Sequence, residues 1–117
     1  MNGITYDYMQ EYIRSLIPES TGKYLELEKF AEEHMVPIVQ EETARFLEFI
    51  VSMKKPLKIL ELGTAIGYSA ILMYESSKTN PKITTIERDE KMIELAQENF
   101  TKYGLAEQIE IKQGDCL

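Results

Sequence analysis

Residues 59–69 read ILELGTAIGYS, and this stretch carries most of what the sequence indicates about fold and function. The pattern is typical of a short buried strand, an acidic residue, a turn that contains Gly63 and Gly67, and the start of a helix. Glycine lets a backbone turn tightly and approach a ligand closely, and a helix start offers unpaired N–H groups. The Glu61 carboxylate disfavours a phosphate at the turn and favours a cation such as a sulfonium. The stretch therefore predicts a site for a small cationic molecule.

The rest of the C-terminal half predicts alternating strands and helices. The predicted strands are 57–62, 82–87 and 108–112, and the predicted helices are 68–76 and 89–103, the second capped by Asp89. Such an order predicts an α/β fold with a parallel sheet and right-handed crossovers. Ligands in these sheets bind at the carboxyl ends of the strands, where the sequence places Glu61, Glu87 and Asp115. We therefore expect three carboxylates at one edge of the sheet.

The N-terminal half has a helical period instead. Helices are predicted over 4–17, 24–34 and 41–53, with an extended link at Val36–Val39. Tyr6, Tyr8 and Tyr12 are interpreted as packing residues of this region. The sequence thus divides into a helical preface, 1–56, and the first half of a cofactor-binding domain, 57–117. Because a third strand leaves a sheet edge unpaired, we expect a fold truncated after that strand and a longer whole protein.

Composition narrows the classes of function. The chain has 117 residues and a formal net charge of −7, which argues against bulk attraction to nucleic acid or an anionic membrane. No apolar run approaches the about 20 residues that span a bilayer, and Met1–Gln10 lack the features of a secretory signal. The single cysteine, Cys116, fits a reducing compartment and is interpreted as a small core residue. A cytoplasmic location is expected.

The residues of the turn at 63–67 distinguish between two classes of cofactor. A dinucleotide fingerprint reads G-x-G-x-x-G, but Ala65 replaces its middle glycine and Tyr68 stands where the last glycine belongs. A pyrophosphate fits such a turn poorly, which favours S-adenosylmethionine. Glu87 could then accept hydrogen bonds from two ribose hydroxyls, and Asp115 from an adenine amino group. The ordinary alternatives stay open: a turn with incidental glycines, an acid before a helix and an acid in a turn.

No residue stands out as a catalytic base or metal ligand. His34 is the only histidine, and its neighbours Glu32 and Glu33 favour a surface position. The carboxylates are scattered and form no cluster with histidine or cysteine. The sequence therefore indicates cofactor binding more strongly than catalysis.

A resemblance to a known family is carried by residues 61–69, ELGTAIGYS. They are similar to the first cofactor motif of class I S-adenosylmethionine-dependent O-methyltransferases of the catechol and caffeoyl-CoA branch. Ile83–Glu87 resembles the second motif of that family, and Gln113–Cys116 the third. The link His34–Val39 is similar to bacterial members, some of which methylate 5-hydroxyuridine in tRNA. The resemblance covers nearly the whole chain.

The resemblance implies a Rossmann-like class I methyltransferase fold and a set of cofactor-binding residues. These are Val39, Glu61, Gly63, Ser69, Glu87 and Asp115. Glu61 and Gly63 would border the methionine part of the cofactor, and Ser69 would lie near its carboxylate. The family also binds a divalent metal, often magnesium, through acidic residues that would follow Leu117. The implied reaction is methyl transfer to a hydroxyl, of tRNA 5-hydroxyuridine or of a small catechol-like phenol.

Two other functions are kept open. One is the cofactor domain of an NAD-dependent oxidoreductase, which the turn at Ala65 disfavours. The other is a non-catalytic fragment that self-associates through its preface and its unpaired sheet edge. On the favoured interpretation the chain is a homo-oligomer with no membrane partner, and it binds cofactor without catalysing transfer alone.

Overall fold

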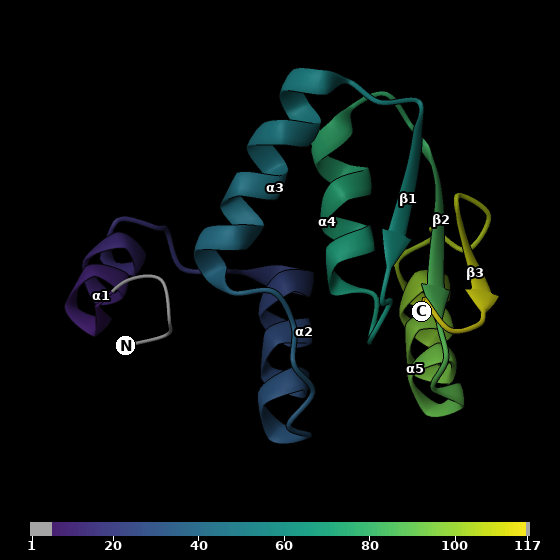
Figure 1. The fold of residues 1–117 in the computed structure, drawn as a ribbon, viewed down its shortest axis with the longest axis horizontal. Helices are drawn as coiled ribbons and strands as arrows, with labels where there is room; N and C mark the ends of the chain where they lie inside the picture. The colour runs from purple at the N-terminus through teal and green to yellow at the C-terminus, as the bar shows by residue number, and fades with distance from the viewer. Residues whose placement is uncertain (1–5, 117) are drawn as a thin grey trace.

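The computed structural model describes residues 6–116 and places three helices before an alternating α/β unit (Figure 1). The helices are α1 (Asp7–Ser15), α2 (Gly22–Glu33), α3 (Glu41–Lys54), α4 (Tyr68–Ser77) and α5 (Glu90–Lys102). The strands are β1 (Lys58–Leu62), β2 (Lys82–Glu87) and β3 (Ile109–Gln113). The predicted elements are all present among these residues, and none of their ends is shifted by more than three residues. Asp89 caps α5 as expected, because its side chain accepts from the N–H groups of Lys91 and Met92.

The sheet is parallel and its order is β1-β2-β3, which confirms the predicted α/β architecture. Ile59 pairs with Ile83, and Glu61 with Thr85, so these positions share one face of the sheet. Helix α4 contacts β2 on that face, and α5 contacts β2 and β3. The register therefore sets Glu61 beside a threonine of the neighbouring strand.

The hydrophobic core lies between this face of the sheet and the helices. Ile71, Ile83 and Phe100 are fully buried at its centre. Helix α4 has buried residues on all of its sides, because it packs against α3 on one side and the sheet on the other. From the preface, Leu27 and Ala44 join the same cluster. The preface helices α2 and α3 are thus part of one core with the α/β unit.

The other face of the sheet carries apolar side chains that the described residues leave in contact with solvent. Leu60 and Leu62 of β1 are 66% and 62% exposed. On α3, Phe46 and Phe49 are 62% and 61% exposed. Large apolar side chains on β1 and on α3 are therefore left in contact with solvent.

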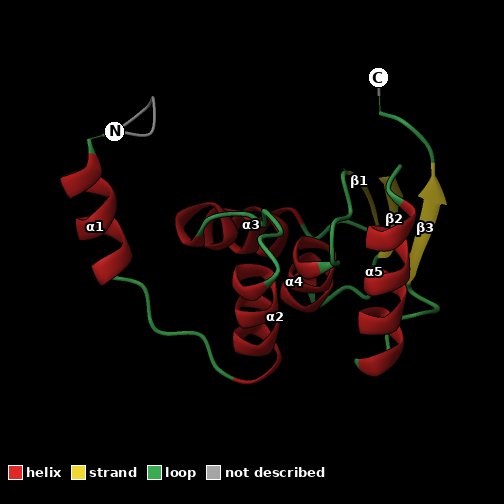
Figure 2. Cartoon of the chain, turned by 90° about the horizontal axis from the view of Figure 1, so that it is seen from below, coloured by secondary structure: helices red, strands yellow, loops and turns green. Residues whose placement is uncertain are grey.

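Helix α1 stands apart from the rest of the molecule in both views (Figures 1 and 2). It contains no buried residue, and Tyr6, Tyr8 and Tyr12 are 61%, 66% and 63% exposed, so their predicted packing role is wrong. The helix is also shorter than predicted: it ends at Ser15, and positions 4 and 5 lie outside the described residues. The Cα radius of gyration is 14.5 Å, against about 13 Å for a compact chain of this length. Helical spacing therefore identified the apolar stripe of α1 but not whether anything covers it.

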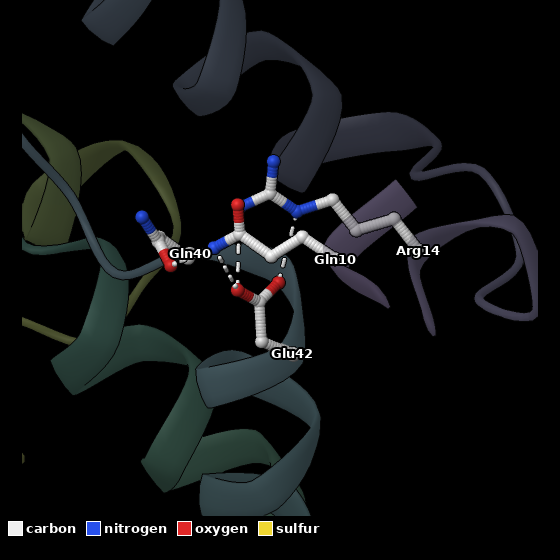
Figure 3. A network of polar contacts seen from close by, with 4 residues as sticks. All are labelled: Gln10, Arg14, Gln40 and Glu42. Carbon is white, nitrogen blue, oxygen red and sulfur yellow. Dashed lines mark hydrogen bonds and ion pairs between the residues drawn. The ribbon is translucent and has the colours of Figure 1, made fainter. Parts of the chain in front are cut away.

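Polar contacts join α1 to the start of α3 (Figure 3). Arg14 donates to both carboxylate oxygens of Glu42, through Nε at 3.0 Å and Nη2 at 3.2 Å. Gln10 Nε2 donates to Glu42 and to Gln40, each at 3.4 Å. The hydrogen bond from Arg14 holds the pKa of Glu42 below its ordinary value. A two-point arginine–carboxylate contact fixes orientation as well as distance.

Replacing Arg14 with methionine is expected to release α1 while leaving the core intact. Because exposed ion pairs contribute little to global stability, the thermal midpoint should not change, but cleavage in residues 16–21 should be about two- to fivefold faster. Limited proteolysis with a nonspecific protease measures this. Arg45→Met is the matched control, since Arg45 pairs with Glu48 within α3. Equal cleavage rates in the two variants would contradict the anchoring role.

Candidate cofactor site

The turn between β1 and α4 has a backbone that its residues specify closely. Gly63 and Gly67 have φ of 90° and 93°, a left-handed region that favours glycine. Ala65, at the position of the middle glycine of a dinucleotide motif, has a φ of 48° and keeps this conformation too. Phe100 of α5 packs directly under Gly67, where an added Cβ would lie 2.6 Å from its ring. Asn99 Nδ2 donates to the Ile66 carbonyl at 2.8 Å and holds the turn from the same side.

Glu61 lies at the carboxyl end of β1 in a buried hydrogen-bond chain. Thr85 Oγ1 donates to Glu61 Oε1 at 2.8 Å, and the Thr64 and Thr85 hydroxyls lie 2.6 Å apart. Burial raises the pKa of Glu61 to about 7, against a smaller opposing effect of the Thr85 hydrogen bond. The nearby Glu87 carboxylate raises it further. A cation that approaches a carboxyl group with a raised pKa stabilises the ionised form of that group.

Glu87 ends β2 and connects the turn to α5. Its Oε1 accepts from the Ala65 N–H at 3.0 Å, and its Oε2 accepts from the N–H groups of Arg88 and Asp89 at 3.1 and 3.0 Å. A carboxylate oxygen accepts about two hydrogen bonds, so Oε1 retains a free acceptor site while Oε2 is filled by the backbone. The side chain is therefore a structural link as well as a potential ligand contact.

Two cavities meet at Gly63, on either side of the turn. The first, about 300 Å³, is lined by Val39, Thr64 and Ser69 among others, and the second, about 270 Å³, by Glu87 and Asp115. Each is near the lower limit of volume for small-molecule pockets. Together their linings include residues at or just beyond the ends of β1, β2 and β3.

The first cavity combines a helix start with the link from the preface. Gly67 is the N-cap of α4 and offers no side-chain cap, so the N–H groups of the first turn remain available to a ligand. Ser69 lies in this first turn, and Pro37, Ile38 and Val39 form the opposite wall. A carboxylate would suit the helix start, and an apolar segment would suit the wall.

The second cavity has a charged rim. Arg88 Nη1 lies 3.7 Å from Asp115 Oδ2, and both side chains are largely exposed. Gly114 lies on the floor, with its N–H donating to the Glu87 carbonyl at 3.0 Å.

Five of the six predicted cofactor-binding residues line these cavities, and Glu61 lies directly behind the turn. The sequence interpretation missed Thr64, Thr85 and Asn99, which hold the turn in place. Thr85 could have been found, since it lies two residues after Ile83 in β2 and therefore on the same inward face of the strand. A polar residue at such a position needs a hydrogen-bond partner.

Other candidate residues lie elsewhere. His34 is exposed as expected, with its ring stacked on Phe30 at 4.0 Å between centroids. Cys116 is exposed, so its predicted core position is wrong; it lies beyond the end of β3, where no helix covers it. Within residues 6–116, no group of three or more histidine, cysteine, aspartate or glutamate side chains is arranged to hold a metal ion. Nor is any helix in that range long and apolar enough to cross a membrane.

Comparisons with known proteins agree with this geometry. A family model described as O-methyltransferase matches residues 17–117. A catechol O-methyltransferase from Niastella koreensis is 31% identical over all of this chain and 54% of its own length. A crystal structure from Staphylococcus aureus, provisionally named a caffeoyl-CoA O-methyltransferase, has a TM-score of 0.82 and 35% identity over 93% of this chain and 52% of its own.

A second solved structure was determined with a ligand. It is an S-adenosylhomocysteine-bound methyltransferase from Podospora anserina, with a TM-score of 0.83 and 27% identity over 97% of this chain and 50% of its own. The present chain spans about half the length of each of these relatives. The family-model match over residues 17–117 includes α2 through β3 and the residues that line both cavities.

Proposed function

The chain belongs to the O-methyltransferase family, and from this premise we propose that it binds S-adenosylmethionine for methyl transfer to a hydroxyl oxygen. The observation that carries the proposal is the pair of cavities that meet at Gly63, one of which is lined by the carboxylates of Glu87 and Asp115. The bound ligand of the Podospora anserina relative supports the same cofactor class.

We assign the cofactor contacts to the six residues predicted from the sequence. Glu61 attracts the cationic methionine part, while Gly63 allows close approach of the backbone. Val39 packs against the ligand from the link, and Ser69 lies by its carboxylate at the start of α4. Glu87 accepts from the ribose through the free site on Oε1, and Asp115 accepts from the adenine amino group.

When bound, S-adenosylmethionine would supply an activated methyl group: the acceptor oxygen would take the methyl while the S–C electron pair stays on sulfur and the hydroxyl proton passes to solvent. The residues of this chain bind and orient, and in such a transfer positioning supplies much of the rate. The hydrogen bonds to the turn from Asn99 and Glu87 keep this geometry rigid before the ligand arrives. We assign no catalytic base to residues 6–116, and we propose that these residues bind cofactor without catalysing transfer alone.

Magnesium does not fit the described residues. The resemblance places the acidic metal ligands after Leu117, and residues 6–116 hold no group of three or more histidine, cysteine, aspartate or glutamate side chains arranged to bind a metal ion. No step of the proposed function is therefore routed through a metal held by these residues.

For the acceptor, we favour a small catechol-like phenol over tRNA 5-hydroxyuridine. The formal net charge of −7 opposes binding to a polyanion, and the Niastella koreensis relative is a catechol O-methyltransferase. The tRNA alternative is supported by the resemblance of the His34–Val39 link. Saturable binding of tRNA at physiological salt would favour that alternative.

We also propose that the chain self-associates in the cytoplasm and that it divides into a helical preface, 1–56, and the first half of a cofactor-binding domain, 57–117. The exposed Phe46, Phe49 and Leu60 support self-association, and the single cysteine supports a reducing compartment. Light scattering with and without cofactor tests the oligomeric state. A monomer at every concentration would contradict this part of the proposal.

Calorimetric titration tests the cofactor directly. S-adenosylmethionine and S-adenosylhomocysteine are expected to bind with measurable heat, and NAD at least about tenfold more weakly, because Ala65 and Tyr68 crowd a pyrophosphate. Preferential binding of NAD would reject the proposed cofactor. Absence of binding by all three ligands, together with self-association, would favour the non-catalytic module.

A further inference from the structure

Thr85 occupies a position from which it acts on the site without touching a ligand. Its exposed fraction is 0%, and it lies on β2 behind both Glu61 and the turn. Its hydroxyl donates to Glu61 Oε1 at 2.8 Å and lies 2.6 Å from the Thr64 hydroxyl. Thr64 lines the first cavity, so the three side chains connect a buried carboxyl to the cavity wall.

The direction of these hydrogen bonds is fixed by counting protons. A hydroxyl donates one hydrogen bond, and Thr85 uses its proton on Glu61. Thr64 must then donate to Thr85, so the remaining lone pairs of the Thr64 oxygen can only accept. If Glu61 is protonated and donates instead, Thr85 turns its proton to Thr64. The Thr64 proton then needs another acceptor, and Thr64 is no longer held as an acceptor for a cation.

We propose that Thr85 is a positioning residue that holds Glu61 and Thr64 together as acceptors for the cationic group of the cofactor. This inference rests on the proposed function, since it names the part of the ligand that the chain of hydroxyls recognises. It extends the site from single side chains to a unit of three residues. The methyl group of Thr85 packs in the core, and the hydroxyl is the functional part.

The charges around Glu61 fit this role. From β2 it is faced by the neutral Thr85 and by the Glu87 carboxylate, and from the turn by the neutral Thr64. Burial and Glu87 raise the pKa of Glu61 to about 7, and the Thr85 hydrogen bond opposes them. Removing this hydroxyl should therefore raise the pKa of Glu61 further and leave it protonated at neutral pH.

The experiment compares wild type with Thr85→Val, which has nearly the same shape, and Thr85→Ser, which keeps the hydroxyl. S-adenosylmethionine affinity is measured by calorimetry from about pH 5 to about pH 9, which brackets the Glu61 pKa of about 7. At about pH 7 we expect affinity to fall about tenfold in Thr85→Val, corresponding to loss of one charge-assisted hydrogen bond. The midpoint of its pH profile should move up by roughly one unit, and Thr85→Ser should restore both.

A structural role alone gives a different result. If Thr85→Val weakens binding equally at every pH, or if Thr85→Ser behaves like Thr85→Val, the positioning role is rejected. Circular dichroism identifies a variant that has not folded. The Glu61 carboxyl carbon is also titrated by NMR in the ligand-free variants. If wild type binds no cofactor, the proposed function fails, and an unchanged Glu61 midpoint in Thr85→Val separately overturns the role of Thr85.

Discussion

Glu61→Gln is expected to abolish cofactor binding and, above neutral pH, to make the ligand-free protein more stable than wild type. Binding is lost because an amide cannot neutralise a cationic ligand as a carboxylate does. Stability rises because the neutral side chain avoids the unfavourable ionisation of a carboxyl group in a buried position next to Glu87. The amide oxygen can still accept from Thr85, so the fold keeps its hydrogen bond.

The effect depends on pH in a defined direction. The pKa of Glu61 is raised from 4.5 to about 7 in the folded protein, and in the unfolded chain it returns to the ordinary value. Below the unfolded pKa the group is protonated in both states, and it costs the fold nothing. As pH rises through this interval the unfolded chain releases its proton first, so wild type loses up to about 3 kcal/mol of stability by about pH 8. Glu61→Gln does not have this loss.

Urea unfolding at about pH 5 and about pH 8 measures the difference. The stability gain of Glu61→Gln should be small at the lower pH and should grow toward the higher one. Glu110→Gln is the control, because Glu110 is an exposed acid on β3. A gain that does not depend on pH would mean that Glu61 is already ionised at low cost and that the cation site is misassigned.

Gly67→Ala is expected to have the largest effect on folding. The added Cβ would lie 2.6 Å from Phe100 Cε1 and 2.9 Å from Cζ, in a residue whose φ of 93° is already unfavourable for alanine. Phe100 is fully buried and cannot move aside. Backbone strain and overpacking together should cost about 4 kcal/mol.

Gly63→Ala separates the two contributions. Gly63 has a φ of 90°, but an added Cβ would meet no atom within 4 Å, so only the backbone strain of about 1–2 kcal/mol should appear. In the double variant Gly67→Ala, Phe100→Leu, the two effects should be less than additive because the clash is relieved. Equal losses in Gly63→Ala and Gly67→Ala, measured by urea unfolding, would show that Phe100 does not limit the turn.

The placement of Glu61 and Glu87 could be predicted because each ends a strand that its own residues indicate. The β-branched residues of Ile83–Ile86 predicted β2, and a parallel order brings Glu61 and Glu87 to one edge of the sheet. The support beneath the turn could not be found this way. Asn99 lies 33 positions from Ile66, and nothing local in the α5 sequence indicates this contact. For α1, periodicity describes which side chains share a face and carries no information about whether a partner covers that face.

The uncovered face of the sheet also affects how the chain responds to heat and denaturant. Unfolding raises heat capacity mainly by wetting apolar surface, and the denaturant m value follows the same newly exposed area. Leu60 and Leu62, together with Phe46 and Phe49, are already largely hydrated in the native state. The heat-capacity increment and the m value should therefore be smaller than 117 residues would ordinarily give, and a flatter dependence of stability on temperature follows.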